Sequence, residues 1–287
     1  MASEAILITG GDENFFPYVE RALKSIQALS SIGELDIGII DHGFSPEQAT
    51  KLRSLGYRVV VPEWTLNVPA ALRNPKQLGL VARTALRDYF PGYRLYLWFD
   101  GDAWAQTAEF LSAYLEGARS RGTAVAPENG AGYGPTLAER RWWVGNMVAA
   151  YGPVKGLRLG LATSVNIGVV ALSDVSPQWA AWIKRYQQAI DRTGKLNLDQ
   201  HAFQAALRLD TSGAALVSPR FNWICTLSSP AWDRSRKMLC DPGSPHEPIS
   251  IVHLAGPNKL RKYTLPVVGS GSQTVTASLI PNELALL

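Results

Sequence analysis

The stretch Leu95-Tyr96-Leu97-Trp98-Phe99-Asp100-Gly101-Asp102 places two acidic side chains directly after a continuous apolar run. A short apolar run that ends at a turn signal is typical of a strand buried on both faces, as in a parallel sheet covered by helices. Ligands of open α/β sheets bind beyond the carboxyl ends of such strands. We therefore expect Asp100 and Asp102 to lie at a ligand-binding edge of the sheet.

The glycine between the two acids indicates a metal site. Gly101 lets the backbone turn, so that both carboxylates face one point instead of alternating between the two faces of a strand. Two hard oxygen ligands with open positions suit Mg²⁺ or Mn²⁺, with phosphate oxygens and water completing the shell. The alternative is that Asp-Gly marks only a turn. Trp104 and Ala105 do not fit an EF-hand loop, and Trp104 departs from the Asp-x-Asp-x-Thr/Val pattern of haloacid-dehalogenase phosphatases.

Short apolar runs alternate with amphipathic stretches along the rest of the chain, which predicts βαβ units. This alternation predicts an α/β fold with a mixed, mostly parallel central sheet flanked by helices. Strands are expected at residues 5–9, 35–41, 58–62, 94–99, 123–127, 165–172 and 249–254. Helices are expected from about 17 to Gly33, from 45 to Gly56, over 74–90, 107–119, 136–150 and 197–209, and from 176 onward.

Composition excludes several classes of protein. The chain has 287 residues, of which 46% are hydrophobic and 18% charged, so a disordered chain is excluded. The net charge of +4 is too small to predict a nucleic-acid partner. Two cysteines, Cys225 and Cys240, exclude a disulfide framework and a four-cysteine zinc site. Without an apolar run long enough for a membrane span or a signal peptide, a cytoplasmic location is expected.

Two further segments carry candidate ligands. His253 ends the apolar run that starts at Ile251, and Lys259 follows it, so they are candidates for a third metal ligand and for a cation that neutralises phosphate. Each alone is more often a structural histidine or a surface lysine. The end of the first strand and the loop after it contain Thr9-Gly10-Gly11-Asp12, and their backbone and Asp12 are placed to hold a nucleotide. It has neither the Gly-Lys-Ser/Thr ending of a P-loop nor a GxGxxG pattern.

Taken together in chain order, these motifs resemble the GT-A-fold glycosyltransferases, in particular family 8 with its glycogenin-like and bacterial galactosyltransferase-like members. The resemblance extends over about residues 6–260. It implies that Thr9, Gly10 and Asp12 contact uracil and ribose, and that the acid-x-acid motif is Asp100-Gly101-Asp102. The remaining matches are Arg83 before that motif, Asn166-Ile167-Gly168, Asp199-Gln200, Pro219-Arg220-Phe221-Asn222, and His253 with Gly256 and Lys259. Leu260-Arg261 replaces the Pro-Trp that usually follows in the family.

The resemblance implies a metal-dependent glycosyltransferase that moves a sugar from a UDP-sugar to an acceptor with retention of configuration. Mn²⁺ or Mg²⁺ would bind Asp100, Asp102 and His253, and Asp199 and Gln200 would lie near the transferred sugar. The implied domain spans 1–263, with a nucleotide-binding half (1–130) and an acceptor half (131–263). The tail 264–287 is either an edge hairpin or a mobile segment. Two alternatives stay open: a phosphohydrolase with Asp100 as nucleophile, and a non-catalytic module that binds nucleotide or glycan.

The acceptor is a glycan, a protein or a lipid-linked molecule, and the sequence offers aromatic candidates for contacting it. Arg140-Arg141-Trp142-Trp143, Trp223 and Trp232 lie in the expected acceptor half. These rings suit sugar stacking, and they equally suit core packing. A third interpretation is a peripheral membrane contact, since adjacent Arg and Trp side chains suit a membrane interface.

Overall fold

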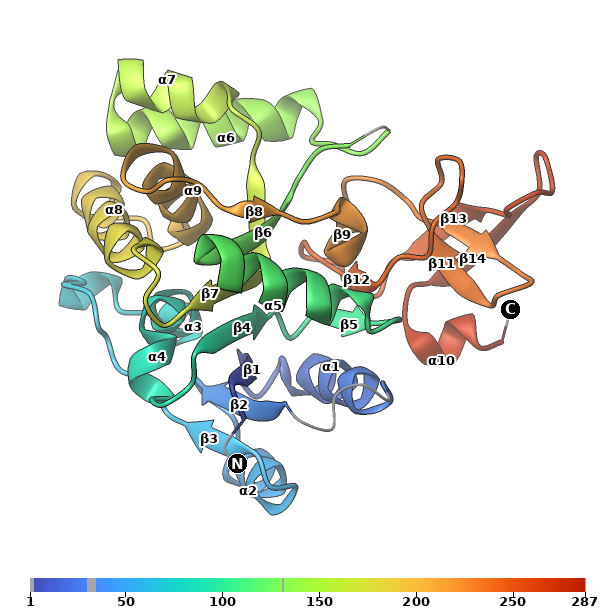
Figure 1. Ribbon diagram of the computed structural model, residues 1–287, viewed down its shortest axis with the longest axis horizontal. Coiled ribbons are helices and arrows are strands. Elements are labelled where there is room, and N and C mark those ends of the chain that lie inside the picture. Colours follow the sequence, from blue (N-terminus) through green and yellow to red (C-terminus); the bar gives the residue numbers. More distant parts are fainter. Residues whose placement is uncertain (1–2, 30–34, 131, 287) are drawn as a thin grey trace.

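A central sheet of seven strands organises the protein, in the order β3-β2-β1-β4-β7-β6-β8 (Figure 1). The computed structural model describes residues 3–29, 35–130 and 132–286. The strands are β1 (Ala5–Gly11), β2 (Asp36–Asp41), β3 (Arg58–Val60), β4 (Leu95–Phe99), β6 (Thr123–Pro127), β7 (Val165–Ser173) and β8 (Ala215–Leu216). All pairs are parallel except those that β7 makes with β4 and β6. The predicted mixed, mostly parallel sheet is confirmed.

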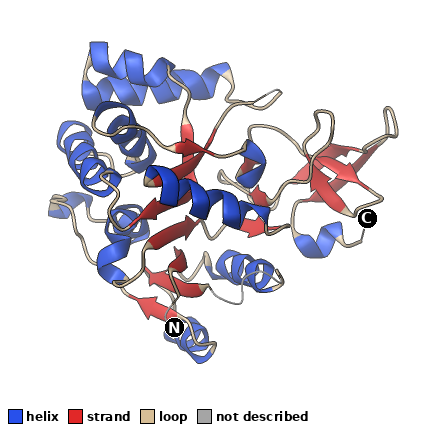
Figure 2. Ribbon diagram, in the orientation of Figure 1, coloured by secondary structure: helices blue, strands red, loops and turns tan. Residues whose placement is uncertain are grey.

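Helices cover both faces of this sheet, as the ribbon coloured by secondary structure shows (Figure 2). On one face, Leu7 and Leu97 pack with residues of α1 (Phe16–Gln27) and α5 (Glu109–Arg121). On the other face, Tyr96 and Trp98 pack with α8 (Gln178–Thr193) and α9 (Asp199–Leu209). Alternate residues of β4 therefore enter opposite cores, which is why the whole run is apolar.

Local sequence sets several helix boundaries. Ser45 and Thr136 begin α2 (Pro46–Ser54) and α6 (Leu137–Tyr151) with capping boxes, and glycines in the left-handed conformation end α5 and α8. Helix α1 ends at Gln27, whereas Gly33, its predicted end, lies outside the described residues.

The helix predicted for residues 74–90 forms over residues 75–89, but as four short consecutive segments rather than one regular α-helix. Asn74 does cap the first turn, accepting from the backbone N–H of Lys76 at 3.1 Å. The segment then divides into η3 (Pro75–Gln77), α3 (Leu78–Ala82), η4 (Arg83–Ala85) and α4 (Leu86–Tyr89). Every residue from 81 to 86 is buried, so packing on all sides, rather than helical periodicity, determines the path of the chain here.

A helix that the sequence did not predict follows α6. Helix α7 (Pro153–Leu161) packs back on α6, and the two form a helical hairpin at the top of Figure 1. Gly156 and Gly160 face α6 closely, since a Cβ at Gly156 would lie 2.4 Å from the Met147 carbonyl oxygen. The glycines that weaken a helix in isolation are thus what allows this contact.

The C-terminal part adds small sheets beside the main one. Strand β12 (Ile251–His253) lies between β5 (Ala103–Ala105) and β9 (Trp223–Ile224), and β10 (Ala231–Asp233) pairs with β11 (Met238–Cys240). Of the two alternatives for the tail, the structure has the hairpin, between β13 (Lys262–Pro266) and β14 (Thr274–Ser278), followed by α10 (Pro281–Leu284). Trp223 and Trp232 are buried in this part, so for them the core interpretation is confirmed.

No helix within the described ranges combines the length and the apolar character that crossing a bilayer requires.

Candidate active site

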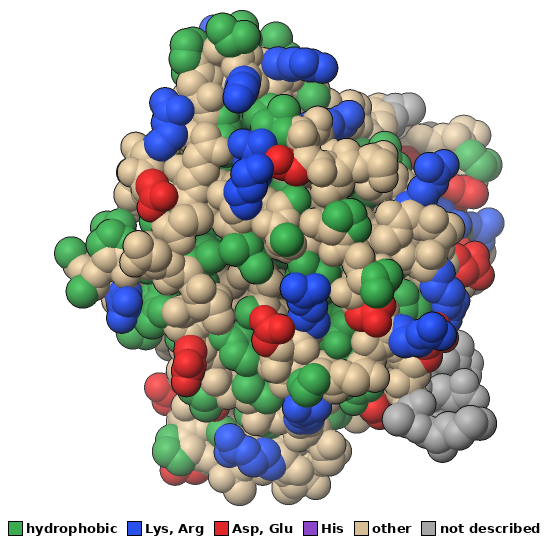
Figure 3. Space-filling view, turned by 60° about the vertical axis from the view of Figure 1, so that its left-hand side comes forward, with side chains coloured by type: hydrophobic (Ala, Val, Ile, Leu, Met, Phe, Trp, Pro, Cys, Tyr) green, Lys and Arg blue, Asp and Glu red, His purple; other side chains and the backbone are tan. Residues whose placement is uncertain are grey.

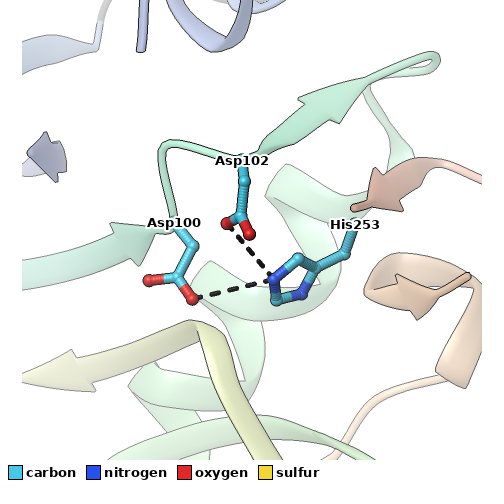
Figure 4. Close-up of side chains that lie close together, drawn as sticks. All are labelled: Asp100, Asp102 and His253. Carbon is cyan, nitrogen blue, oxygen red and sulfur yellow. Dashed lines mark ion pairs between the residues drawn. The ribbon is translucent and has the colours of Figure 1, made fainter. Parts of the chain in front are cut away.

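The two acids of the opening motif lie at the end of β4, next to His253 (Figure 4). Asp100 follows β4, and the turn at Gly101 leads through Asp102 into β5. Strand β12 pairs antiparallel with β5 and brings His253 opposite Ala103. The His253 Nε2 atom lies 3.7 Å from Asp100 Oδ2 and 3.4 Å from Asp102 Oδ1. One ligand atom from each residue lies within 4.8 Å of the others, a spacing that suits one metal ion.

The imidazole of His253 is held by amide side chains behind it. Its Nδ1 atom lies 2.9 Å from Asn222 Oδ1, and Asn222 Nδ2 donates to Asn166 Oδ1 at 2.9 Å. Since an amide oxygen accepts, Nδ1 carries the proton, and Nε2 faces the two carboxylates. Gly168 leaves room for this arrangement: a Cβ there would lie 2.3 Å from His253 Cε1.

Two cations contact the acids from different elements. Lys259 Nζ pairs with Asp102 Oδ2, and Arg83 Nη1 lies 3.4 Å from Asp100 Oδ1. The second nitrogen of the Arg83 guanidinium, Nη2, lies 3.0 Å from Asp199 Oδ2. Asp100 is further fixed by Trp98, whose Nε1 donates to Oδ1 at 2.6 Å.

Burial and neighbouring charges shift the pKa values of these groups in opposite directions. Burial raises the pKa of the Asp102 carboxyl, but His253 and Lys259 outweigh it and hold this pKa well below its ordinary value. For His253, burial lowers the pKa, yet Asp102 and Asp100 leave it raised. Burial also raises the pKa of Asp199, although Arg83 opposes this. In the absence of a metal, the carboxylates of Asp100 and Asp102 therefore favour a positive charge on the side chain that they both face, His253.

Beside these acids is a cavity of about 280 Å³, which we call the Asp100 cavity. Gly10 and Asp12 line it, so the structure brings the N-terminal loop and the acidic motif together as the sequence indicated. Asp12 also accepts from the Phe15 backbone N–H at 2.9 Å, which fixes the turn into α1. Thr9 lies one residue earlier, fully buried within β1 and away from this lining. The further lining residues include Arg83, Asp100, Gly101 and Asp102.

A second cavity of about 420 Å³, which we call the Gln200 cavity, is lined by Asp199, the ion-pair partner of Arg83. Asn166, Asp199, Gln200 and Gly256 line it, so Gly256 is placed here and not in the Asp100 cavity. The contact between Arg83 and Asp199 joins the two cavities.

Several residues of these cavities escaped the sequence analysis. Glu128 directly follows β6, and its Oε1 accepts from Gln200 Nε2 at 2.9 Å and from Asn166 Nδ2 at 3.0 Å. His42 follows β2 in the same way and lines the Asp100 cavity with Lys76. A polar residue directly after a predicted strand was the signal that could have identified Glu128 and His42.

The aromatic candidates divide between core and cavity. Trp143 is buried and stacks on His201 with ring centroids 3.9 Å apart, and Trp142 contacts the same ring edge-on. Both tryptophans line the Gln200 cavity with Arg140. Burial lowers the pKa of His201 to about 3, so the ring between them is neutral at physiological pH.

Comparison with known proteins identifies the fold. No protein-family model matches the chain, and no curated protein matches its sequence. Mouse xyloside xylosyltransferase 1 in its apo form matches with a TM-score of 0.52 at 13% identity, over 90% of this chain and 98% of that one. An active-site mutant of LgtC matches with a TM-score of 0.51 at 14% identity, over 88% of both chains.

A third solved structure extends this result. The glycosyltransferase GlyE of Streptococcus pneumoniae TIGR4 matches with a TM-score of 0.50 at 15% identity, over 95% of this chain and 58% of that one. At such identities the likeness establishes the fold. The chain therefore has the GT-A fold of these glycosyltransferases, and the predicted fold class is confirmed.

Proposed function

We propose that this protein is a metal-dependent glycosyltransferase that takes a nucleotide-diphosphate sugar, specifically a UDP-sugar, as donor. One observation carries the proposal: Asp100, Asp102 and His253 converge at the carboxyl edge of a glycosyltransferase-type sheet. This cluster borders the cavity lined by Gly10 and Asp12. An acidic cluster beside a cavity at this edge is where the fold class binds its ligands.

The donor is assigned to the Asp100 cavity. Gly10 and Asp12 are proposed to contact the uridine, because they lie at the end of β1 and line the cavity. Lys259 and Arg83 are proposed to offset charge on the diphosphate, since each already lies against one acid of the motif. Fixed cations that face a leaving group stabilise the negative charge that develops on it.

Asp100, Asp102 and His253 fit a divalent cation, Mn²⁺ or Mg²⁺. The fit rests on the donor set, which consists of two carboxylates and the imidazole nitrogen that faces them. The other ring nitrogen is hydrogen-bonded to Asn222. Such an ion, when bound, supplies Lewis-acid stabilisation of the departing diphosphate. The amide network of Asn222 and Asn166 keeps the imidazole oriented for this role.

The acceptor is assigned to the Gln200 cavity, in the half formed by residues 131–263. Asp199 and Gln200 are proposed to face the transferred sugar, because both line this cavity and Asp199 contacts Arg83 at the boundary with the donor side. Glu128 positions Gln200 by accepting from its amide. Retention of configuration is proposed from the resemblance to family 8, and the acceptor is a glycan, protein or lipid-linked molecule.

A panel of nucleotide sugars, each with Mn²⁺ and with chelator, tests this proposal by thermal shift and by donor hydrolysis. We expect UDP-sugars to raise the melting temperature only with metal present. Asp100→Asn and Asp102→Asn should abolish both this shift and turnover. Asp88→Asn, which changes an exposed acid of α4, is the matched control and should retain both.

Three results would contradict the proposal. Full turnover in both motif variants would remove the metal site from the reaction. Phosphate release from simple phosphomonoesters with a trapped aspartyl-phosphate at Asp100 would indicate a phosphohydrolase. Metal-dependent binding of donors without turnover under any acceptor or hydrolysis condition would indicate a binding module.

A further inference from the structure

The outer surface of the α6–α7 hairpin exposes hydrophobic side chains that the fold does not use. Val154, Leu157 and Leu161 follow one another at i, i+3 and i+7, so they share one face of α7. Val154 is 83% exposed and Leu161 66% exposed. Leu137 and Trp142 of α6 are exposed as well, while the other large exposed hydrophobic side chains are scattered singly over the described chain. A grouping of this kind marks an interaction surface.

The opposite face of α7 already accounts for its packing on the protein. Gly156 and Gly160 lie against α6, where added Cβ atoms would come within 2.4 Å of Val148 Cα and 2.9 Å of Val144 Cα. Leu159 between them is buried. The apolar outer face is therefore additional to what the hairpin needs in order to fold.

The charge on this surface is positive. Residues 137–161, all of them described, contain Arg140, Arg141, Lys155 and Arg158 and a single acid, Glu139. Glu139 is occupied by the cap of α6, where its Oε2 accepts from the Thr136 N–H at 2.7 Å. Within the described parts of the chain, no acid forms an ion pair with Arg141, Lys155 or Arg158. At the top of Figure 3, hydrophobic and Lys or Arg side chains lie side by side.

We infer that the α6–α7 surface docks on an anionic lipid membrane. Exposed Leu, Val and Trp side chains interspersed with Lys and Arg are the composition of a helix that lies in the plane of a membrane interface. Basic residues near an anionic leaflet are attracted to it. A second copy of the chain is a poorer occupant, because a two-fold contact would bring the same cations against one another.

This docking would orient the molecule. Trp142 of α6 is exposed and also lines the Gln200 cavity. Since α7 packs on α6, docking would place the membrane beside a helix that lines the cavity to which the acceptor is assigned. Docking does not require the proposed reaction, since it depends only on the exposed hydrophobic side chains and the cations of α6 and α7.

Vesicle co-sedimentation of the full chain tests the inference. We expect binding to vesicles of phosphatidylcholine with about one third phosphatidylserine, little binding to pure phosphatidylcholine, and weakening by salt. Lys155→Gln with Arg158→Gln should reduce the partition coefficient about fivefold per charge removed. Leu157→Ser with Leu161→Ser should reduce it roughly tenfold per side chain.

A matched control variant changes residues at the other end of the molecule. Arg53→Gln with Leu55→Ser changes an exposed cation and an exposed leucine near the end of α2, and it should leave binding unchanged. All variants change exposed side chains, so circular dichroism and thermal melting should match the parent protein. No binding by the parent chain, or equal loss in the α2 control, would overturn the inference. A parent chain that sediments as a dimer, while the α7 leucine variant is a monomer with unchanged vesicle binding, would assign the surface to a second copy instead.

Discussion

Gly168→Ala is the substitution that tests most directly how the residues of the proposed metal site are positioned. Gly168 lies in β7 and is not itself a ligand. A Cβ there would meet three atoms: His253 Cε1 at 2.3 Å, Asn166 Oδ1 at 2.8 Å and Asp100 Oδ2 at 2.9 Å. Two of these atoms belong to proposed metal ligands, and the third belongs to the residue that holds the network behind His253.

The expected size of the effect follows from these distances. Ordinary van der Waals contact begins at 3.4 Å, so the imidazole must move by about 1 Å or the strand must shift. Functional constellations tolerate displacements of roughly 0.5 Å, and a misplacement of about 1 Å costs on the order of 10²-fold in rate. We expect Gly168→Ala to bind Mn²⁺ about 10- to 100-fold more weakly and to lose about 1–3 kcal/mol of unfolding free energy.

Isothermal titration with Mn²⁺ and urea unfolding separate the two effects. Gly117→Ala is the matched control, because its Cβ would lie 2.8 Å from Ala124 Cβ in the core between α5 and β6, away from the site. It should lose similar stability and keep the Mn²⁺ affinity of the parent protein. If Gly168→Ala binds Mn²⁺ as the parent does, or if Gly117→Ala weakens binding equally, the reasoning is refuted.

Three further predictions concern groups around the two cavities. Asn222→Leu removes the acceptor for the His253 Nδ1–H and should weaken Mn²⁺ binding about 10- to 100-fold by titration, whereas unchanged affinity would contradict the orienting role. Arg83→Met leaves buried Asp199 unpaired and should cost about 3–5 kcal/mol in urea unfolding, part of which a second change, Asp199→Asn, should restore; a loss below about 1 kcal/mol would contradict this. His201 has its pKa lowered from 6.5 to about 3, so the native state resists protonation and stability falls as the pH drops below 6.5. Between pH 7 and pH 5 this loss is about 2 kcal/mol, and His201→Phe should lack it; an identical pH dependence in the variant would show that the ring is not buried neutral.

The sequence identified the three residues of the acidic cluster, which the structure brings together, better than the residues that support them. Asp100 directly follows the apolar run of β4, Asp102 comes two residues later, and His253 ends the apolar run of β12, so each stands at the end of a predicted strand. Glu128 has the same placement after β6, but a single carboxylate after a strand is common at turns. Its role depends on its contact with Gln200 of α9, and no local sequence pattern predicts that contact.

Local sequence patterns also could not predict the direction of a strand or where a helix is interrupted. The apolar run of β7 reads the same whether the strand is parallel or antiparallel, and the structure makes it antiparallel to both neighbours. The segment 74–90 is helical as its periodicity predicts, yet a 3-10 turn interrupts the α-helix at Arg83–Ala85, where every residue is buried. For α7, two glycines reduce helix propensity, and only the close contact with α6 compensates for them.

Arg83 connects the Asp100 cavity with the Gln200 cavity through its two ion pairs. Its guanidinium is buried and forms ion pairs with two acids. Asp100 lines the Asp100 cavity, and Asp199 lines the Gln200 cavity. Burial lowers the pKa of this arginine, but the two acids outweigh it, so the charge is retained. A change of charge at Asp100, as on binding a divalent cation, therefore alters the balance between Arg83 and Asp199, because both acids share one cation. Electrostatic coupling of this kind needs no movement of the backbone, and it links the proposed metal site to the side chain proposed to face the transferred sugar.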